Sequence, residues 1–246
     1  VIGGMLADRA IGFRKAILTG GAFMAPGQFI LALSSGSTGS LHSESIFFLG
    51  LAALTVGNGL FKPNISSFLG TFYDRNDTRK DGAYTLFYMG INIGAFLAPL
   101  TCGYLGQRVG WHYGFFSAGL GMLLGMVVFF LNFKHLEGKG HAPDGADQWR
   151  FMGLKAFPLT LLGCLVVIPI FSFLINSEGI TDWLLFGAGF ACLGYLLYTA
   201  FTAEDRAEGQ RPYVFLILFF FPMIFWGLFE QAGGAAKGFN TIAGDD

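Results

Sequence analysis

Two charged residues lie inside long apolar stretches of this sequence. Lys62 falls within the apolar segment 46–72 and Glu230 within 213–235, whereas every other charge lies in a polar connector or at the end of a segment. A charge at bilayer depth costs about 3 kcal/mol or more unless it faces a cavity or a partner. An amine and a carboxylate at that depth can bind opposite charges or exchange protons, so both are candidate functional residues.

Simpler explanations of the two charges differ in strength. Lys62 lies about 15 Å from the cytoplasmic end of its segment at about 1.5 Å per residue, and a lysine stem of about 6 Å cannot reach the headgroups from there. Glu230 lies only about 8 Å from the outer end of its segment, so an interfacial carboxylate stays open. Their depths in the membrane differ by about 15 Å. We therefore expect Lys62 and Glu230 not to pair with each other, and each to pair with a different residue.

Polar and aromatic residues near these charges extend the candidate site. Asn92 lies in the middle of the run YTLFYMGINIGA (84–95) and can bind substrate or join two helices. Trp226 is four residues before Glu230 and shares a helical face with it, which suits a substrate ammonium and equally suits ordinary packing. Gly90 and Gly94 predict a close contact with another helix.

Pro63 directly follows Lys62 in the run GNGLFKPNISS (57–67). Proline removes a backbone donor and leaves the carbonyl of Gly59 without its helical partner. We therefore expect the helix to bend or unwind beside the lysine, as a hinge in a transporter or as a kink that only shapes packing.

The elements that position these residues are seven apolar segments, each about the length a bilayer requires. They are 16–34, 46–72, 83–105, 113–133, 157–175, 183–201 and 213–235. The composition agrees, because 53% of residues are hydrophobic and 13% charged, against about 25% charged in soluble domains. The sequence predicts an all-α polytopic membrane protein.

Basic residues collect in alternate connectors and set the orientation. Of the 15 Lys and Arg residues, twelve lie in the odd-numbered connectors. These connectors are 1–15, 73–82, 134–156 and 202–212. By the positive-inside rule they face the cytoplasm of the cell (inner) membrane.

Several function classes are disfavoured. The net charge of −1 gives no basic field for nucleic acid. The four histidines lie in or beside connectors, and neither H-E-x-x-H nor G-x-S-x-G occurs, which argues against an intramembrane enzyme. Cys102, Cys164 and Cys192 are each isolated in an apolar run, so we expect no disulfide, metal or cofactor.

The first connector, GGMLADRAIGFRK (3–15), reads as a tight cytoplasmic turn. It resembles the G-x-L-A-D-R-x-x-G-x-R-K loop between helices two and three of the major facilitator superfamily. The run 57–67, the run DTRKDG (77–82) with FYMGIN (87–92), and FWGLFEQ (225–231) resemble helices four, five and seven of proton-dependent oligopeptide transporters, bacterial type. Together these matches span nearly the whole chain in that family's order.

The resemblance implies an incomplete major facilitator fold with an inserted two-helix hairpin. Residues 1–133 would form the end of helix two and helices three to six of the N-terminal bundle, and 134–156 a mobile cytoplasmic linker. Residues 157–201 would be the accessory hairpin, facing lipid, and 202–246 a cytoplasmic loop with helix seven, which starts the C-terminal bundle. Helices one and eight to twelve and most of helix two, which carry the expected partners of Lys62 and Glu230, are absent.

The resemblance also implies proton-coupled symport of di- and tripeptides by alternating access. Asn92 would hold a polar end of the peptide, Trp226 would wall a side-chain pocket, and Lys62 would bind the carboxylate or the coupling acids. Glu230 would alternate between an ion-paired and a protonated state. Asp8, Arg9 and Arg14 would latch the cytoplasmic ends of helices, unless they form an ordinary solvated turn.

Two alternatives stay open at this point. The same scaffold could carry another solute, such as nitrate or a drug. The protein could also be a membrane receptor or scaffold without flux. In each case the expected partners include the lipid bilayer and the missing helices, and exclude nucleic acid; for the symporter they are short peptides and protons.

Overall fold

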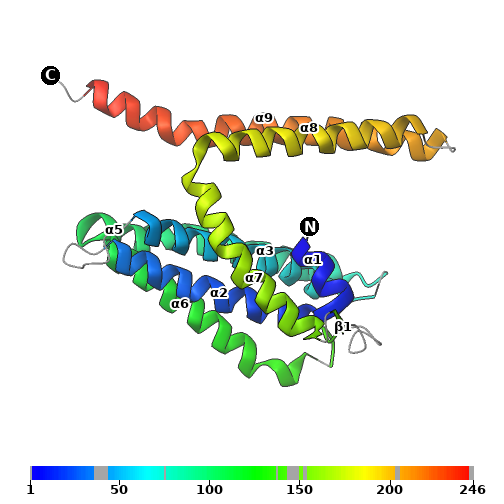
Figure 1. The fold of residues 1–246 in the computed structure, drawn as a ribbon, viewed down its shortest axis with the longest axis horizontal. Helices are drawn as coiled ribbons and strands as arrows, with labels where there is room; N and C mark the ends of the chain where they lie inside the picture. The colour runs from blue at the N-terminus through cyan, green and yellow to red at the C-terminus, as the bar shows by residue number, and fades with distance from the viewer. Residues whose placement is uncertain are drawn as a thin grey trace. The chain divides into compact units, whose positions relative to one another are not determined.

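The computed structural model describes residues 2–35, 44–74, 76–136, 138–142, 150–151, 154–202 and 206–243. For residues 150, 151, 154, 178, 206–209 and 230–243 it describes the backbone alone. The chain divides into two compact units, with the boundary between Glu178 and Gly179 (Figure 1).

Seven helices of the described chain are long and apolar enough to cross a membrane, which confirms the seven predicted segments. They are α2 (Phe13–Ser34), α3 (Glu44–Gly70), α4 (Arg79–Ala98) continued by η2 (Pro99–Gly103) and α5 (Tyr104–Arg108), α6 (Trp111–Leu131), α7 (Ala156–Asn176), α8 (Glu178–Thr202) and α9 (Arg206–Ala243). The smaller elements are α1 (Ile2–Leu6), η1 (Ala7–Ile11), η3 (Phe133–His135), β1 (Arg150–Phe151) and β2 (Leu154–Lys155).

Glycines bring α2 and α3 into backbone contact in the first unit. A Cβ atom added at Gly20 would lie 2.6 Å from the carbonyl oxygen of Gly57, and one added at Gly27 would lie 3.0 Å from that of Gly50. Both pairs are seven residues apart on each helix, so they repeat along one antiparallel seam. Small residues permit this approach where lipid supplies no hydrophobic driving force between helices.

The predicted glycine contact at Gly90 and Gly94 is wrong for the described residues. A Cβ atom at either position would meet nothing within 4 Å. Two adjacent turns of α4 are therefore open on this side, whereas tightly packed glycines lie on other helices, among them α2, α3 and α6. The spacing of the two glycines indicates a helix surface that another helix could approach closely, but it does not indicate which helix, if any, packs there.

The first connector is shorter than predicted. Residues 2–11 are helical, first as α1 and then as the π-helix η1, in which the N–H of Gly12 donates to the carbonyl of Ala7 (3.0 Å). The chain reverses at Gly12, whose φ of 79° is in the region that favours glycine. The tight turn is thus confined to one residue, because the polar residues before it lie on a helix.

Helix α3 continues through Pro63 from Glu44 to Gly70, so the expected unwinding does not occur. Pro63 still cannot donate to the carbonyl of Gly59. That oxygen is instead closely approached by Gly3 of α1, where no Cβ atom would fit. Packing of α1 against the weakened turn supports the helix where this hydrogen bond is missing. The bend that we also expected at Pro63 stays a prediction.

The segment after α6 is partly fastened to the first bundle. The Arg14 side chain donates through Nε to the carbonyl of Lys139 (2.5 Å) and through Nη2 to that of Leu136 (3.2 Å), and the Arg14 N–H donates to Gly140 (3.1 Å). Leu136, Lys139 and Gly140 are therefore held against the start of α2, whereas we had expected mobility throughout 134–156. Residues 143–149 lie outside the described residues.

Helix α7 packs across α3 in the first unit (Figure 1). Its buried residues repeat every four positions, at Ala156, Thr160, Cys164 and Ile168. β1 and β2 pair antiparallel just before it. Helix α7 belongs to the first unit and α8, from Gly179 on, to the second. The hairpin and the domain boundaries expected from the sequence stay predictions.

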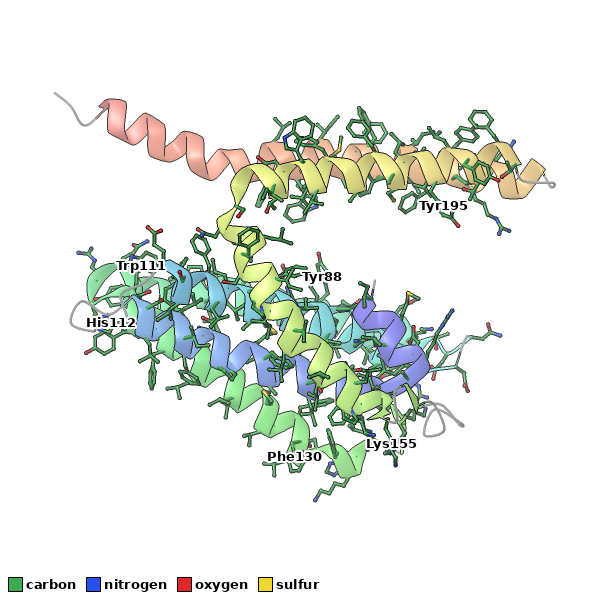
Figure 2. The ribbon with its side chains drawn as sticks, viewed as in Figure 1. Tyr88, Trp111, His112, Phe130, Lys155 and Tyr195 are labelled. Carbon is green, nitrogen blue, oxygen red and sulfur yellow. The ribbon has the colours of Figure 1, made fainter. Side chains whose placement is uncertain are left out.

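Large apolar side chains cover the outer surfaces of the described helices. Trp111 and Phe130 project from the first unit and Tyr195 from α8 (Figure 2), and each is more than half exposed. Water does not favour such surfaces, and lipid or further helices do.

Candidate functional site

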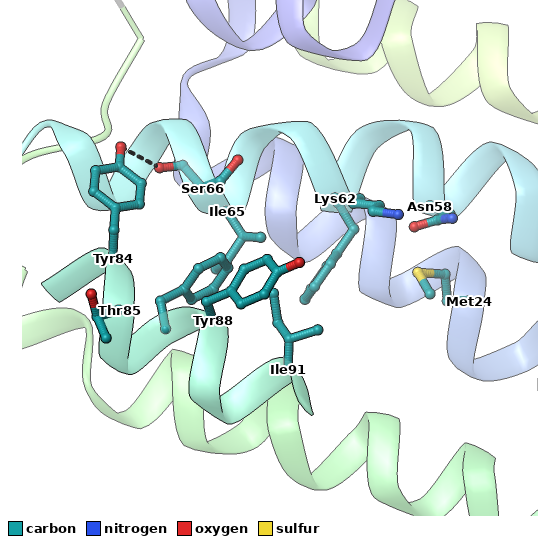
Figure 3. Close-up of a pocket in the computed structure, with 11 residues that line it drawn as sticks. Met24, Asn58, Lys62, Ile65, Ser66, Tyr84, Thr85, Tyr88 and Ile91 are labelled. Carbon is teal, nitrogen blue, oxygen red and sulfur yellow. Dashed lines mark hydrogen bonds between the residues drawn. The ribbon is translucent and has the colours of Figure 1, made fainter. Parts of the chain in front are cut away.

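A cavity of about 1020 Å³ lies beside Lys62 between α3 and α4. The Lys62 side chain is exposed to it, and its amino group points toward Asn58, one turn earlier on the same helix (Figure 3). Phe61 and Ile65 line the same cavity from α3. The wall is therefore mostly apolar, and its polar groups on α3 are the ammonium of Lys62, the amide of Asn58 and the hydroxyl of Ser66.

Helix α4 supplies the opposite wall. Tyr84, Thr85, Tyr88 and Ile91 line it, and Tyr84 donates through its hydroxyl to the carbonyl of Ser66 (3.2 Å), the one hydrogen bond drawn in Figure 3. Tyr84 and Tyr88 are four residues apart and so share a face. Sequence reasoning missed Asn58, Tyr84 and Tyr88, although Asn58 is four residues from Lys62 and helical spacing alone could have identified it.

Asn92 lies one turn beyond Tyr88 and is exposed. Its side-chain amide donates to the carbonyl of Tyr88 (2.8 Å) within α4. It thus joins no second helix among the described residues. A residue on the cavity-lining helix that keeps its amide oxygen available can still accept from an ammonium group.

Trp226 and Glu230 belong to the second unit. The Trp226 ring packs edge-on against Phe225 (5.7 Å between centroids) and Phe229 (5.5 Å) of its own helix. Glu230 lies in α9, and its side chain is outside the described part of the chain. The shared face of the two residues follows from helical spacing, and their function stays a prediction.

The predicted cytoplasmic latch residues behave differently from one another. Asp8 and Arg9 are exposed in η1, and neither side chain has a hydrogen bond or ion pair within the described residues. Arg14 instead binds the carbonyls after α6 and lies over the Phe133 ring at 5.3 Å. Arg14 therefore fastens a loop of the same bundle.

A second contact on the cytoplasmic side lies at the start of α4, the helix that forms one wall of the cavity. Asp77 accepts hydrogen bonds from the backbone N–H of Arg79 (2.9 Å) and from its guanidinium (3.1 and 2.8 Å). The side-chain bonds from Arg79, followed by the backbone bond, hold the pKa of the Asp77 carboxyl below its ordinary value. Arg79 and Asp77 form the only ion pair among the described residues, so Lys62 has no ion-pair partner within them.

These features together describe an open, mostly apolar cavity at membrane depth with one ammonium, one amide and several hydroxyl groups. Such a surface can bind a solute that carries a carboxylate and hydrogen-bonding groups. No group of His, Cys, Asp and Glu within the described residues could hold a metal ion.

The sequence model of one protein family, described as the POT family, matches residues 14–239. The chain is also 32% identical over 230 residues to the dipeptide and tripeptide permease A of Pectobacterium carotovorum subsp. carotovorum (strain PC1), a match that covers 94% of this chain and 43% of the permease.

Solved structures give the same result. The chain matches a crystal structure of the peptide transporter POT in complex with sulfate at a TM-score of 0.70 and 32% identity, covering 94% of this chain and 46% of that one. It matches a POT family transporter in complex with a thioalcohol-conjugated peptide at a TM-score of 0.71 and 30% identity, covering 94% and 47%. The chain spans less than half the length of each of these relatives.

Proposed function

This chain belongs to the POT family, and from that membership we propose that it forms part of a symporter that couples uptake of di- and tripeptides to proton influx. Lys62 is the observation that supports the proposal most. Its ammonium lies deep in a membrane helix and faces a cavity with an apolar wall. Such a charge is costly unless it meets an anion there.

Each candidate residue has a role in the proposed transporter. Lys62 binds the peptide carboxylate or the coupling acids of another helix. Asn92 accepts from the amino end of the peptide, and Trp226 walls a pocket for a side chain. Glu230 takes up a proton when its ion pair opens, because a carboxylate without its cation favours the neutral form in a low dielectric.

Lys62→Ala in the full-length transporter tests the proposal. Proton-driven accumulation of di-alanine in liposomes should fall by about a hundredfold, since a buried charge partner is worth about 3 kcal/mol. Lys155→Ala is the matched control, because it removes an exposed lysine directly before the first residue of α7. It should leave accumulation unchanged. Unchanged accumulation in Lys62→Ala would overturn the proposal.

Counterflow exchange separates the two roles of Lys62. Retained exchange with lost accumulation assigns it to proton coupling, and loss of both assigns it to peptide binding. Competing uptake with nitrate tests the substrate class, because a carrier of nitrate should be inhibited by nitrate and hardly by di-alanine.

A further inference from the structure

Asn64 forms a joint between α3 and α1 on the side of α3 away from Lys62. It is 1% exposed, and its side-chain nitrogen donates to the carbonyl of Gly3 (3.0 Å) and to that of Leu60 (2.7 Å). Both N–H groups of the amide are therefore used. Its Oδ1 atom is buried and has no hydrogen-bond partner in the described chain. A leucine of similar size would avoid burying that oxygen, so packing alone does not account for an amide here.

The joint lies at the turn that Pro63 weakens. Gly59 has lost its helical donor to Pro63, and its carbonyl is covered by the backbone of Gly3. Asn64 bonds to the same Gly3 and, on its own helix, to Leu60. The two contacts brace α1 against the single turn of α3 in which one backbone hydrogen bond is missing.

Lys62 lies within this turn, two residues before Asn64, and successive helical residues are separated by about 100° around the axis. Lys62 consequently faces the cavity while Asn64 faces α1. A rotation or bend of α3 at Pro63 would move the lysine relative to the cavity wall formed by Tyr88. Holding the Asn64 side of this turn against α1 therefore also holds the Lys62 side toward the cavity.

We propose that Asn64 is a positioning residue for Lys62: by tying α3 to α1 at the proline turn, its amide holds the Lys62 side chain toward the cavity. The inference concerns placement of residue 62, and its importance for transport rests on the proposed function. It predicts that α1 and this part of α3 move as one body.

A thiol at position 62 measures placement directly. In the full-length transporter with Cys102, Cys164 and Cys192 replaced by serine, Lys62→Cys is labelled in liposomes with a water-soluble methanethiosulfonate. Asn64→Leu should lower the labelling rate by about tenfold, the size expected for directly coupled residues. Thr55→Val is the control, because Thr55 donates only to Leu51 of its own helix (2.9 Å), and it should leave the rate unchanged.

The outcomes separate this inference from the proposed function. An unchanged labelling rate in Asn64→Leu overturns the positioning role whatever happens to transport. A lower rate, in a transporter whose activity survives Lys62→Ala, supports the positioning role and overturns the proposed function. Equal falls in Asn64→Leu and Thr55→Val indicate general loosening of α3 and overturn the inference.

Two further variants apply if Asn64→Leu does not reach the membrane. Asn64→Ser keeps one donor and should lower labelling by about threefold. Gly3→Ala places a methyl group against the carbonyl of Gly59 and should lower labelling without touching Asn64. Normal labelling in both overturns the positioning role.

Discussion

At the residue scale, the geometry of Arg14 explains why a fork-shaped cation stands at this position. Its guanidinium donates to two carbonyls, those of Leu136 and Lys139, and its Cζ atom lies 5.3 Å from the centroid of the Phe133 ring. A lysine ammonium is a point charge and cannot match all three contacts. The basic loop that resembles a superfamily motif thus has a local structural role besides any role in gating.

Arg14→Lys and Arg14→Ala should both loosen the segment after α6. Two side-chain hydrogen bonds of about 1 kcal/mol each are lost, so the amides of Leu136 and Lys139 should exchange with deuterium at least about tenfold faster. Mass spectrometry of the peptide around these residues measures the rate. Arg9→Ala removes an exposed arginine from the same connector and is the control. If Arg14→Lys exchanged at the wild-type rate, the forked guanidinium would not be required at this position.

At the scale of elements, the seam between α2 and α3 depends on glycines that admit no side chain. Gly57 illustrates this, since an added Cβ atom would lie 2.6 Å from both the Gly20 carbonyl and the Met24 side chain. Gly59, on the same helix, has open space at the corresponding position. The two residues form a natural pair for comparing packing with helix propensity.

Gly57→Ala should destabilise the protein by about 1–3 kcal/mol, the usual cost of overpacking. Gly59→Ala should be neutral or stabilise by up to about 1 kcal/mol, because alanine is the better helix former. Thermal unfolding in detergent, followed by loss of monodisperse protein, compares both with wild type. A lower midpoint for Gly59→Ala than for Gly57→Ala would contradict the seam.

Helix positions could be predicted from sequence because a bilayer imposes length and apolarity on every span. Partners could not, since composition does not state which face meets which helix. Gly90 and Gly94 were expected to pack and are open, while Gly20 and Gly57 were not singled out and carry the seam. Asn64 likewise looks like any polar residue until the turn of α1 beside it is known.

The candidate site was predicted in part for the same reason. Lys62 was identified because a lone charge in an apolar run is unusual whatever surrounds it. Tyr84 and Tyr88 became candidates only once α4 was seen to form the opposite wall, whereas helical spacing from Lys62 could have identified Asn58. The function of a neutral polar residue on one helix can be inferred only when the helix that it faces is known.

At the scale of the whole molecule, the family match and the seven apolar helices confirm an all-α, multi-pass inner-membrane protein of the major facilitator fold. Within the described residues, most of α4, most of α8 and most of residues 210–229 of α9 are exposed. These surfaces require lipid or further helices. The chain spans under half the length of the relatives that it matches.

Native cysteines test the lipid-facing prediction for residues 157–201. Cys164 is buried on α7 and Cys192 is exposed on α8, and neither should react with a membrane-impermeant maleimide in intact liposomes, because neither should face water. Both should react after addition of sodium dodecyl sulfate. Lys139→Cys, at the cytoplasmic side, is the control that should react throughout; labelling of Cys192 before detergent would place α8 beside an aqueous path.

The glycine seam has a consequence for how the protein is made. Helices α2 and α3 are consecutive, so their contact closes over a short loop, and contacts between neighbouring segments form fastest. Both helices are synthesised before α4, and segments fold in order during translation. Helix α3, which carries Lys62, can therefore pack against α2 during synthesis, before α4 forms the opposite wall of the cavity.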